Sequence, residues 1–119
     1  MSLIDIHSRL GNTALFYAII MAVWGLWRFF RRQGVDSSYS GALVIAEILI
    51  VLQGAVGFFL LFRGAQQHFM HILYGIVAIL IIPGIFAYTK GDEHRRAMLL
   101  YGVGCLFLIG ILLRATMTG

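Results

Sequence analysis

Residues 41–62 read GALVIAEILIVLQGAVGFFLLF, an apolar run that a single carboxylate, Glu47, and a single amide, Gln53, interrupt. A helix needs roughly 20 mostly apolar residues to cross a bilayer, and this run is long enough. Three other runs resemble it, which gives predicted spans at residues 11–30, 41–62, 69–88 and 97–113. Because short links make consecutive helices antiparallel neighbours, the sequence predicts one all-α domain over residues 1–119, an integral membrane four-helix up-down bundle.

The composition supports a membrane protein and excludes several other classes. Of the 119 residues, 61% are hydrophobic and only 12% are charged, whereas a soluble domain carries about 25% charged residues. Cys105 is the single cysteine, so covalent attachment of a c-type haem through a CxxCH motif is excluded. The net charge of +4 comes from basic residues at the ends of the spans, so we expect no nucleic-acid partner.

The distribution of basic residues predicts the orientation in the membrane. The first and third links and their flanks hold six basic residues, and the opposite side holds three. The two sets are Arg28, Arg31, Arg32, Lys90, Arg95 and Arg96, against Arg9, Arg63 and Arg114. Cytoplasmic loops carry the excess of Lys and Arg. We therefore expect a multi-pass protein of the cell membrane with both termini outside the cytoplasm.

Two histidines near the starts of the first and third spans suggest a site. His7 and His71 are each followed four residues later by a glycine, Gly11 and Gly75. The two spans run in the same direction, so the histidines lie at matched depth in the membrane. Together they can coordinate a metal ion, most naturally the iron of a haem. Each glycine shares the face of its histidine one turn deeper, which leaves room for a flat macrocycle. Simple helix packing is the alternative reading of the glycines.

A weak internal repeat relates the two histidines. Placing His7 over His71 also brings Gly11 onto Gly75, and Ala14 onto a second alanine at position 78. The pattern suggests tandem duplication of a two-helix unit, with halves related by an axis along the membrane normal. Such an axis would place the two histidines opposite each other.

Other residues on the histidine side complete the candidate site. Arg9, Arg63 and Arg114 can pair with haem propionates, because arginine binds carboxylates by charge-assisted hydrogen bonds. Solvated interfacial arginines are the alternative. His68 precedes His71 by three residues and shares its helix face, so it is an alternate ligand or a member of a three-histidine copper or zinc site.

Two segments resemble a known family. Asp5-Ile6-His7-Ser8-Arg9 is similar to the acidic-x-x-His-Arg motif of haem A synthases, and residues 46–57 resemble the Gln-Gly-x-x-Gly helix of that family. The chain resembles one four-helix half of such a synthase, with His71 at the position of the second ligand. Small bis-histidine four-helix b-type cytochromes are an equally good comparison. The resemblance implies a haem-binding bundle.

These features predict a membrane protein that holds one b-type haem between His7 and His71. Its expected work is one-electron transfer near the outer membrane face, as a subunit of a respiratory or photosynthetic complex. Its expected partners are membrane lipid, other subunits of that complex, or quinone. The first alternative is a haem-free accessory subunit. The second is a haem- or quinone-handling enzyme, related to haem A synthase, that becomes complete on homodimerisation.

Overall fold

The computed structural model describes residues 2–64, 69–92 and 94–118, and it consists of four helices over those residues. The helices are α1 (Leu3–Phe30), α2 (Ser37–Phe62), α3 (Phe69–Thr89) and α4 (Arg95–Thr118). Each is long and apolar enough to cross a membrane. The described residues contain no strand, so the predicted all-α fold is confirmed, and the chain is a multi-pass membrane protein.

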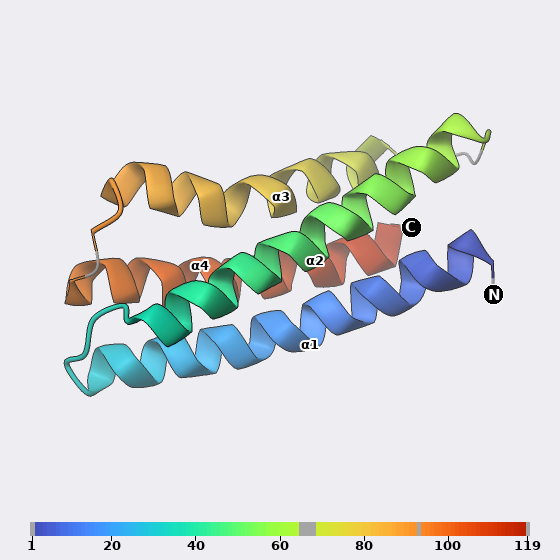
Figure 1. Ribbon diagram of the computed structural model, residues 1–119. Coiled ribbons are helices and arrows are strands. Elements are labelled where there is room, and N and C mark those ends of the chain that lie inside the picture. The colour runs from blue at the N-terminus through green and yellow to red at the C-terminus, as the bar shows by residue number, and fades with distance from the viewer. Residues whose placement is uncertain (1, 65–68, 93, 119) are drawn as a thin grey trace.

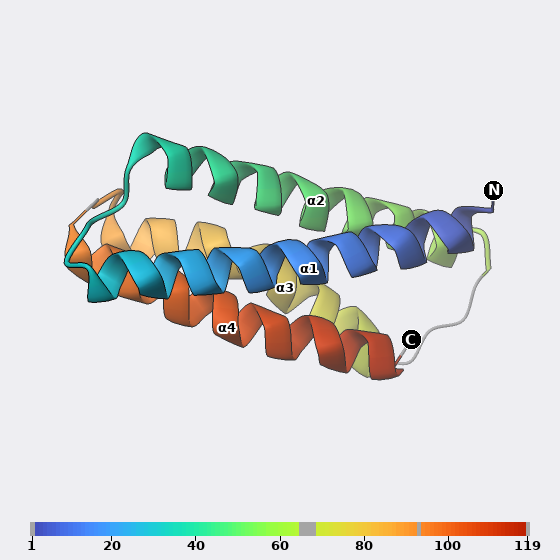
Figure 2. The ribbon, with the colours of Figure 1, turned by 90° about the horizontal axis from the view of Figure 1, so that it is seen from below.

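The helices form an antiparallel up-down bundle (Figures 1 and 2). The α1–α2 and α3–α4 links lie together at one end, here called the link end, and both chain termini lie at the other, here called the open end. α1 and α3 each pack against α2 and α4 but not against each other, so α1 and α3 are diagonal. This arrangement places His7 and His71 on opposite sides of the bundle axis.

Capping extends α1 and α2 beyond the predicted spans. α1 begins at Leu3 because the Ser2 side-chain oxygen accepts a hydrogen bond from the Asp5 amide at 3.1 Å. The Asp36 carboxylate caps α2 in the same way, accepting from the Tyr39 amide at 2.8 Å. His7 therefore lies in the second turn of a helix, where its direction is fixed by the backbone.

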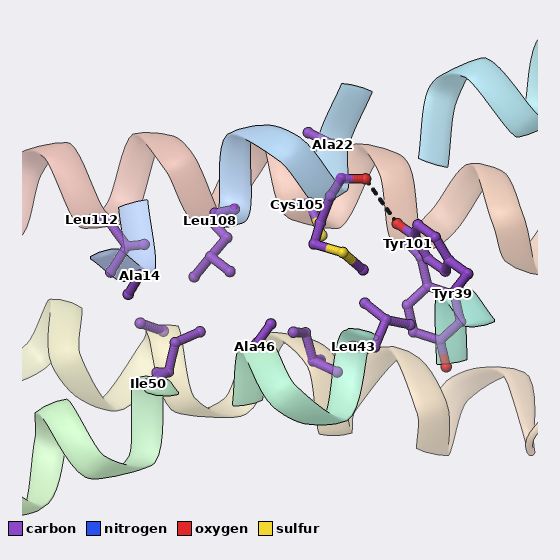
Figure 3. Close-up of a cluster of buried hydrophobic side chains, with 14 of the residues drawn as sticks. Ala14, Ala22, Tyr39, Leu43, Ala46, Ile50, Tyr101, Cys105, Leu108 and Leu112 are labelled. Carbon is purple, nitrogen blue, oxygen red and sulfur yellow. Dashed lines mark hydrogen bonds between the residues drawn. The ribbon is translucent and has the colours of Figure 1, made fainter. Parts of the chain in front are cut away.

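Buried hydrophobic side chains from the helices form the core (Figure 3), and most of the least exposed of them lie in the half nearer the link end. Small residues on α1 allow close approach, and an added Cβ on Gly25 would lie only 3.1 Å from the Gly102 Cα of α4. Tyr39 is fully buried and its hydroxyl donates to the Met21 carbonyl at 2.9 Å, the dashed line in Figure 3. The other described side chains with at most 1% exposure are Met21, Ala22, Ala97, Met98, Cys105 and Leu108.

Candidate functional site

The structure brings His7 of α1 and His71 of α3 together inside the open end of the bundle. Their ring centroids are 6.1 Å apart and their planes are inclined by 66°. Both side chains are partly buried. Because the two helices are diagonal, the imidazoles face each other across the bundle, flanked by α2 and α4.

The separation of the rings suits ligation of one ion by both histidines. When two imidazoles flank one ion, each metal–nitrogen bond is roughly 2 Å long, and each ring centroid lies roughly 1 Å beyond its nitrogen. The two ring centroids are then roughly 6 Å apart. The observed 6.1 Å agrees. Among residues 2–64, 69–92 and 94–118, no group of three or more His, Cys, Asp or Glu could hold a metal. Two protein donors suit an ion whose remaining ligands come from a macrocycle.

His71 is oriented by the backbone of α4. Its Nδ1 atom lies 2.7 Å from the carbonyl oxygen of Ala115. A carbonyl can only accept, so Nδ1 carries the proton and donates it, and this leaves the lone pair on Nε2. Histidines that bind metals are typically held in this way, by a hydrogen bond from the second ring nitrogen. The Nε2 atom of His71 could therefore serve as a ligand to an ion.

His7 is positioned by the close approach of α2. A Cβ added to Gly57 would lie 3.0 Å from the His7 Cε1 atom, so the ring packs directly on the glycine backbone. The backbone of Gln53 also lies beside this ring. The Nδ1 atom of His7 is buried and has no hydrogen-bond partner in the described part of the chain. A buried donor or acceptor without a partner is unusual, and such an atom could bind a water or a ligand.

The two glycines that follow the histidines differ in their surroundings. No atom lies within 4 Å of the position that a Cβ on Gly75 would occupy, so there is open space on that side. On the other side, the Gln53 Nε2 atom lies 2.9 Å from the Cβ position of Gly11. The Gln53 Oε1 atom is buried without a partner among the described residues. A macrocycle would meet free space at Gly75 and a movable amide at Gly11.

The three predicted arginines lie on the helices and ends that surround this site. Arg9 lies two residues after His7 on α1 and is exposed. The exposed Arg63 stacks over the Phe59 ring, with its guanidinium carbon 5.9 Å from the ring centroid. Arg114 directly precedes Ala115, the residue that holds His71.

His94 is not part of this pair. His94 lies at the link end, where its Nδ1 atom is 2.6 Å from the Asp92 carboxylate. His68, the alternate ligand, lies outside the described residues.

The sequence did not show the role of Gly57 or of Ala115. The one signal for Gly57 in the sequence is its place in the Gln-Gly-x-x-Gly spacing of residues 46–57. Ala115 contacts His71 through its backbone carbonyl, which every residue has, so the amino-acid type at position 115 could not predict this contact.

Comparison of the chain with known protein families, curated proteins and solved structures finds no match.

Proposed function

We propose that this protein is a membrane b-type haem protein that transfers single electrons at the open end of the bundle. One observation carries the proposal: His7 and His71 face each other from diagonal helices, with centroids at the separation that two ligands of one iron require. The orientation of His71 by Ala115 supports the same reading, because it leaves Nε2 as the donor.

The chain's own residues hold and orient the group. His71, fixed by the Ala115 carbonyl, would hold the group through Nε2, and His7, packed on Gly57, would hold it from α1. Arg114 and Arg9 supply guanidinium groups for the propionates near the membrane surface. When bound, the haem iron supplies reversible one-electron chemistry. The links between the helices are short, so we infer that the redox partner is a membrane component, either another subunit of a respiratory or photosynthetic complex or a quinone.

We infer that the open end faces away from the cytoplasm, because basic residues are concentrated at the link end. Single cysteines at positions 38 and 118 in a Cys105→Ser background test this orientation. Ser38→Cys should resist an impermeant thiol reagent in intact cells, and Thr118→Cys should react. The reverse labelling would place the histidine pair on the cytoplasmic side.

Substitution of the ligands tests the proposed function. His7→Ala and His71→Ala should each abolish the low-spin haem spectrum of the purified protein or convert it to a high-spin one. His94→Ala, which removes a histidine at the opposite end, is the matched control and should leave the spectrum unchanged. If all three variants keep the wild-type spectrum, the haem is bound elsewhere. If the folded wild type shows no haem absorption, the haem-free accessory subunit becomes the better reading.

A further inference from the structure

A groove between α3 and α4 runs along the surface of the bundle from the link end toward its middle. It has a volume of about 560 Å³ and is lined by apolar side chains, with a glycine on each wall, Gly84 on α3 and Gly104 on α4. No atom lies within 4 Å of the Cβ position of Gly84, so the groove is open there. It ends near Val77 and Phe107.

A polar pocket continues this groove at the link end. The pocket has a volume of about 350 Å³ and is lined by Thr89, Asp92 and Arg96. Tyr88 and Leu100 line both the pocket and the groove, so the two are adjacent. The combined site is amphipathic, with a charged head region at the helix ends and an apolar channel running into the membrane.

The length of the groove indicates what fills it. From Tyr88 to Val77 the α3 face extends by roughly 16 Å at 1.5 Å per residue. The hydrocarbon core of a bilayer is about 30 Å thick, so one leaflet contributes about 15 Å. An acyl chain of one lipid needs only the depth that this groove provides.

The charges of the pocket indicate the headgroup. Arg96 makes no hydrogen bond or ion pair in the described part of the chain, so its guanidinium is available to a ligand. The Asp92 carboxylate lines the same pocket, where its Oδ1 atom accepts from the His94 amide at 3.0 Å and lies 2.6 Å from the exposed His94 Nδ1 atom, so the second carboxylate oxygen is the one that would meet a ligand. A cation and an anion in one pocket match a phosphate and an ammonium group better than a purely anionic headgroup, which Asp92 would repel.

We propose that α3 and α4 bind one zwitterionic glycerophospholipid, with its phosphate at Arg96, its ammonium group toward Asp92 and an acyl chain in the groove. This lipid site lies at the opposite end of the bundle from the histidine pair and does not depend on the proposed haem. It gives the link end a defined position at the membrane surface.

Native mass spectrometry of the full-length protein tests the proposal. The protein is reconstituted in vesicles of equal parts phosphatidylethanolamine and phosphatidylglycerol, then extracted in mild detergent. We expect one retained phosphatidylethanolamine per chain. Arg96→Gln and Gly84→Leu should each lower its retention roughly five-fold or more, a fold-change that corresponds to about 1 kcal/mol. Asp92→Asn should shift the preference toward phosphatidylglycerol.

Two matched variants control for general effects. Arg31→Gln removes a link-end arginine that does not line the pocket, and Gly110→Leu fills an equally open, exposed glycine of α4 outside the groove. Both should keep the lipid, and circular dichroism should show that all variants are folded. The proposal is overturned if no phospholipid is retained, if phosphatidylglycerol is preferred by the wild type, or if the groove and pocket variants bind lipid as well as the controls do.

Discussion

The two ends of the bundle differ in how their buried polar groups are satisfied. At the link end, the Arg28 guanidinium donates to the Gly34 carbonyl at 2.7 and 3.0 Å and lies 3.2 Å from the Asp36 carboxylate. Away from that end, the Oε1 atom of Glu47 near the middle of α2, and the Gln53 Oε1 and His7 Nδ1 atoms toward the open end, are buried without a partner in the part of the chain that the structure describes. Leaving such a group unpaired costs about 1–3 kcal/mol.

Packing follows the same division. The fully buried Tyr39 and Met98 anchor the core in the link half, while the space at Gly75 in the open half is empty of protein atoms. The bundle is thus stabilised mainly at one end, and the other end keeps polar atoms and space that a ligand would satisfy. If the proposed ligand binds at the open end, we expect that stability and ligand binding can each be disturbed without the other.

The largest effect on stability should come from Tyr39 at the link end. Tyr39→Ala removes a buried ring that packs on Trp24, with centroids 5.0 Å apart, and should lower the free energy of unfolding by about 3–5 kcal/mol. Unfolding in a denaturing detergent, followed by circular dichroism, measures the change. Tyr39→Phe keeps the ring and loses only the bond to the Met21 carbonyl, so it should cost about 1–2 kcal/mol.

His7→Ala is the comparison at the open end. It removes a buried polar atom without a described partner, and it should change the stability of the haem-free protein by less than about 1 kcal/mol. If Tyr39→Ala and His7→Ala lower the free energy of unfolding equally, the two ends contribute equally to stability and the contrast between them is wrong.

Gly57→Ala should damage the site and spare the fold. The added methyl group would lie 3.0 Å from the His7 ring, so the imidazole must move, and overpacking of this kind costs about 1–3 kcal/mol. We expect weaker haem retention and a shift toward a high-spin spectrum. Gly54→Ala is the matched control on the same helix, because its methyl group would meet only the flexible end of Ile79 at 2.9 Å. A spectrum that changes equally in both variants would mean that Gly57 has no special relation to His7.

Arg95→Gln should have a smaller effect, confined to the link end. Arg95 donates to the Phe29 carbonyl at 3.0 Å and lies over the Phe29 ring at 4.2 Å, which ties the start of α4 to the end of α1. Its side chain is exposed, so the loss should be about 0.5–1 kcal/mol. The haem spectrum should not change. A loss of haem in this variant would show that the two ends are coupled.

Much of the fold follows from hydropathy, and less of the site does. Long apolar runs and short links predict four antiparallel helices because backbone groups in lipid must be satisfied within each helix. The boundaries of α1 and α4 extend past the apolar runs, since caps and polar turns continue a helix beyond the hydrocarbon core. The prediction that His7 lies near His71 rested only on the spacing of each histidine from a glycine and on the shared direction of the first and third spans.

The finer contacts of the site depend on the rotation of each helix about its own axis. Packing sets that rotation, and periodicity in a nearly uniform apolar helix does not reveal it. This is why the contact of Gly57 with His7 and the filling of the Gly11 side by Gln53 were not predicted.

The reduced-minus-oxidised optical spectrum of the purified wild-type protein, with its haem b content per chain, tests the central claim most directly. Two imidazoles that flank one iron predict the sharp α-band of six-coordinate low-spin haem b and about one haem per chain. Folded, four-helix protein expressed with sufficient haem supply that shows no Soret or α-band would contradict it.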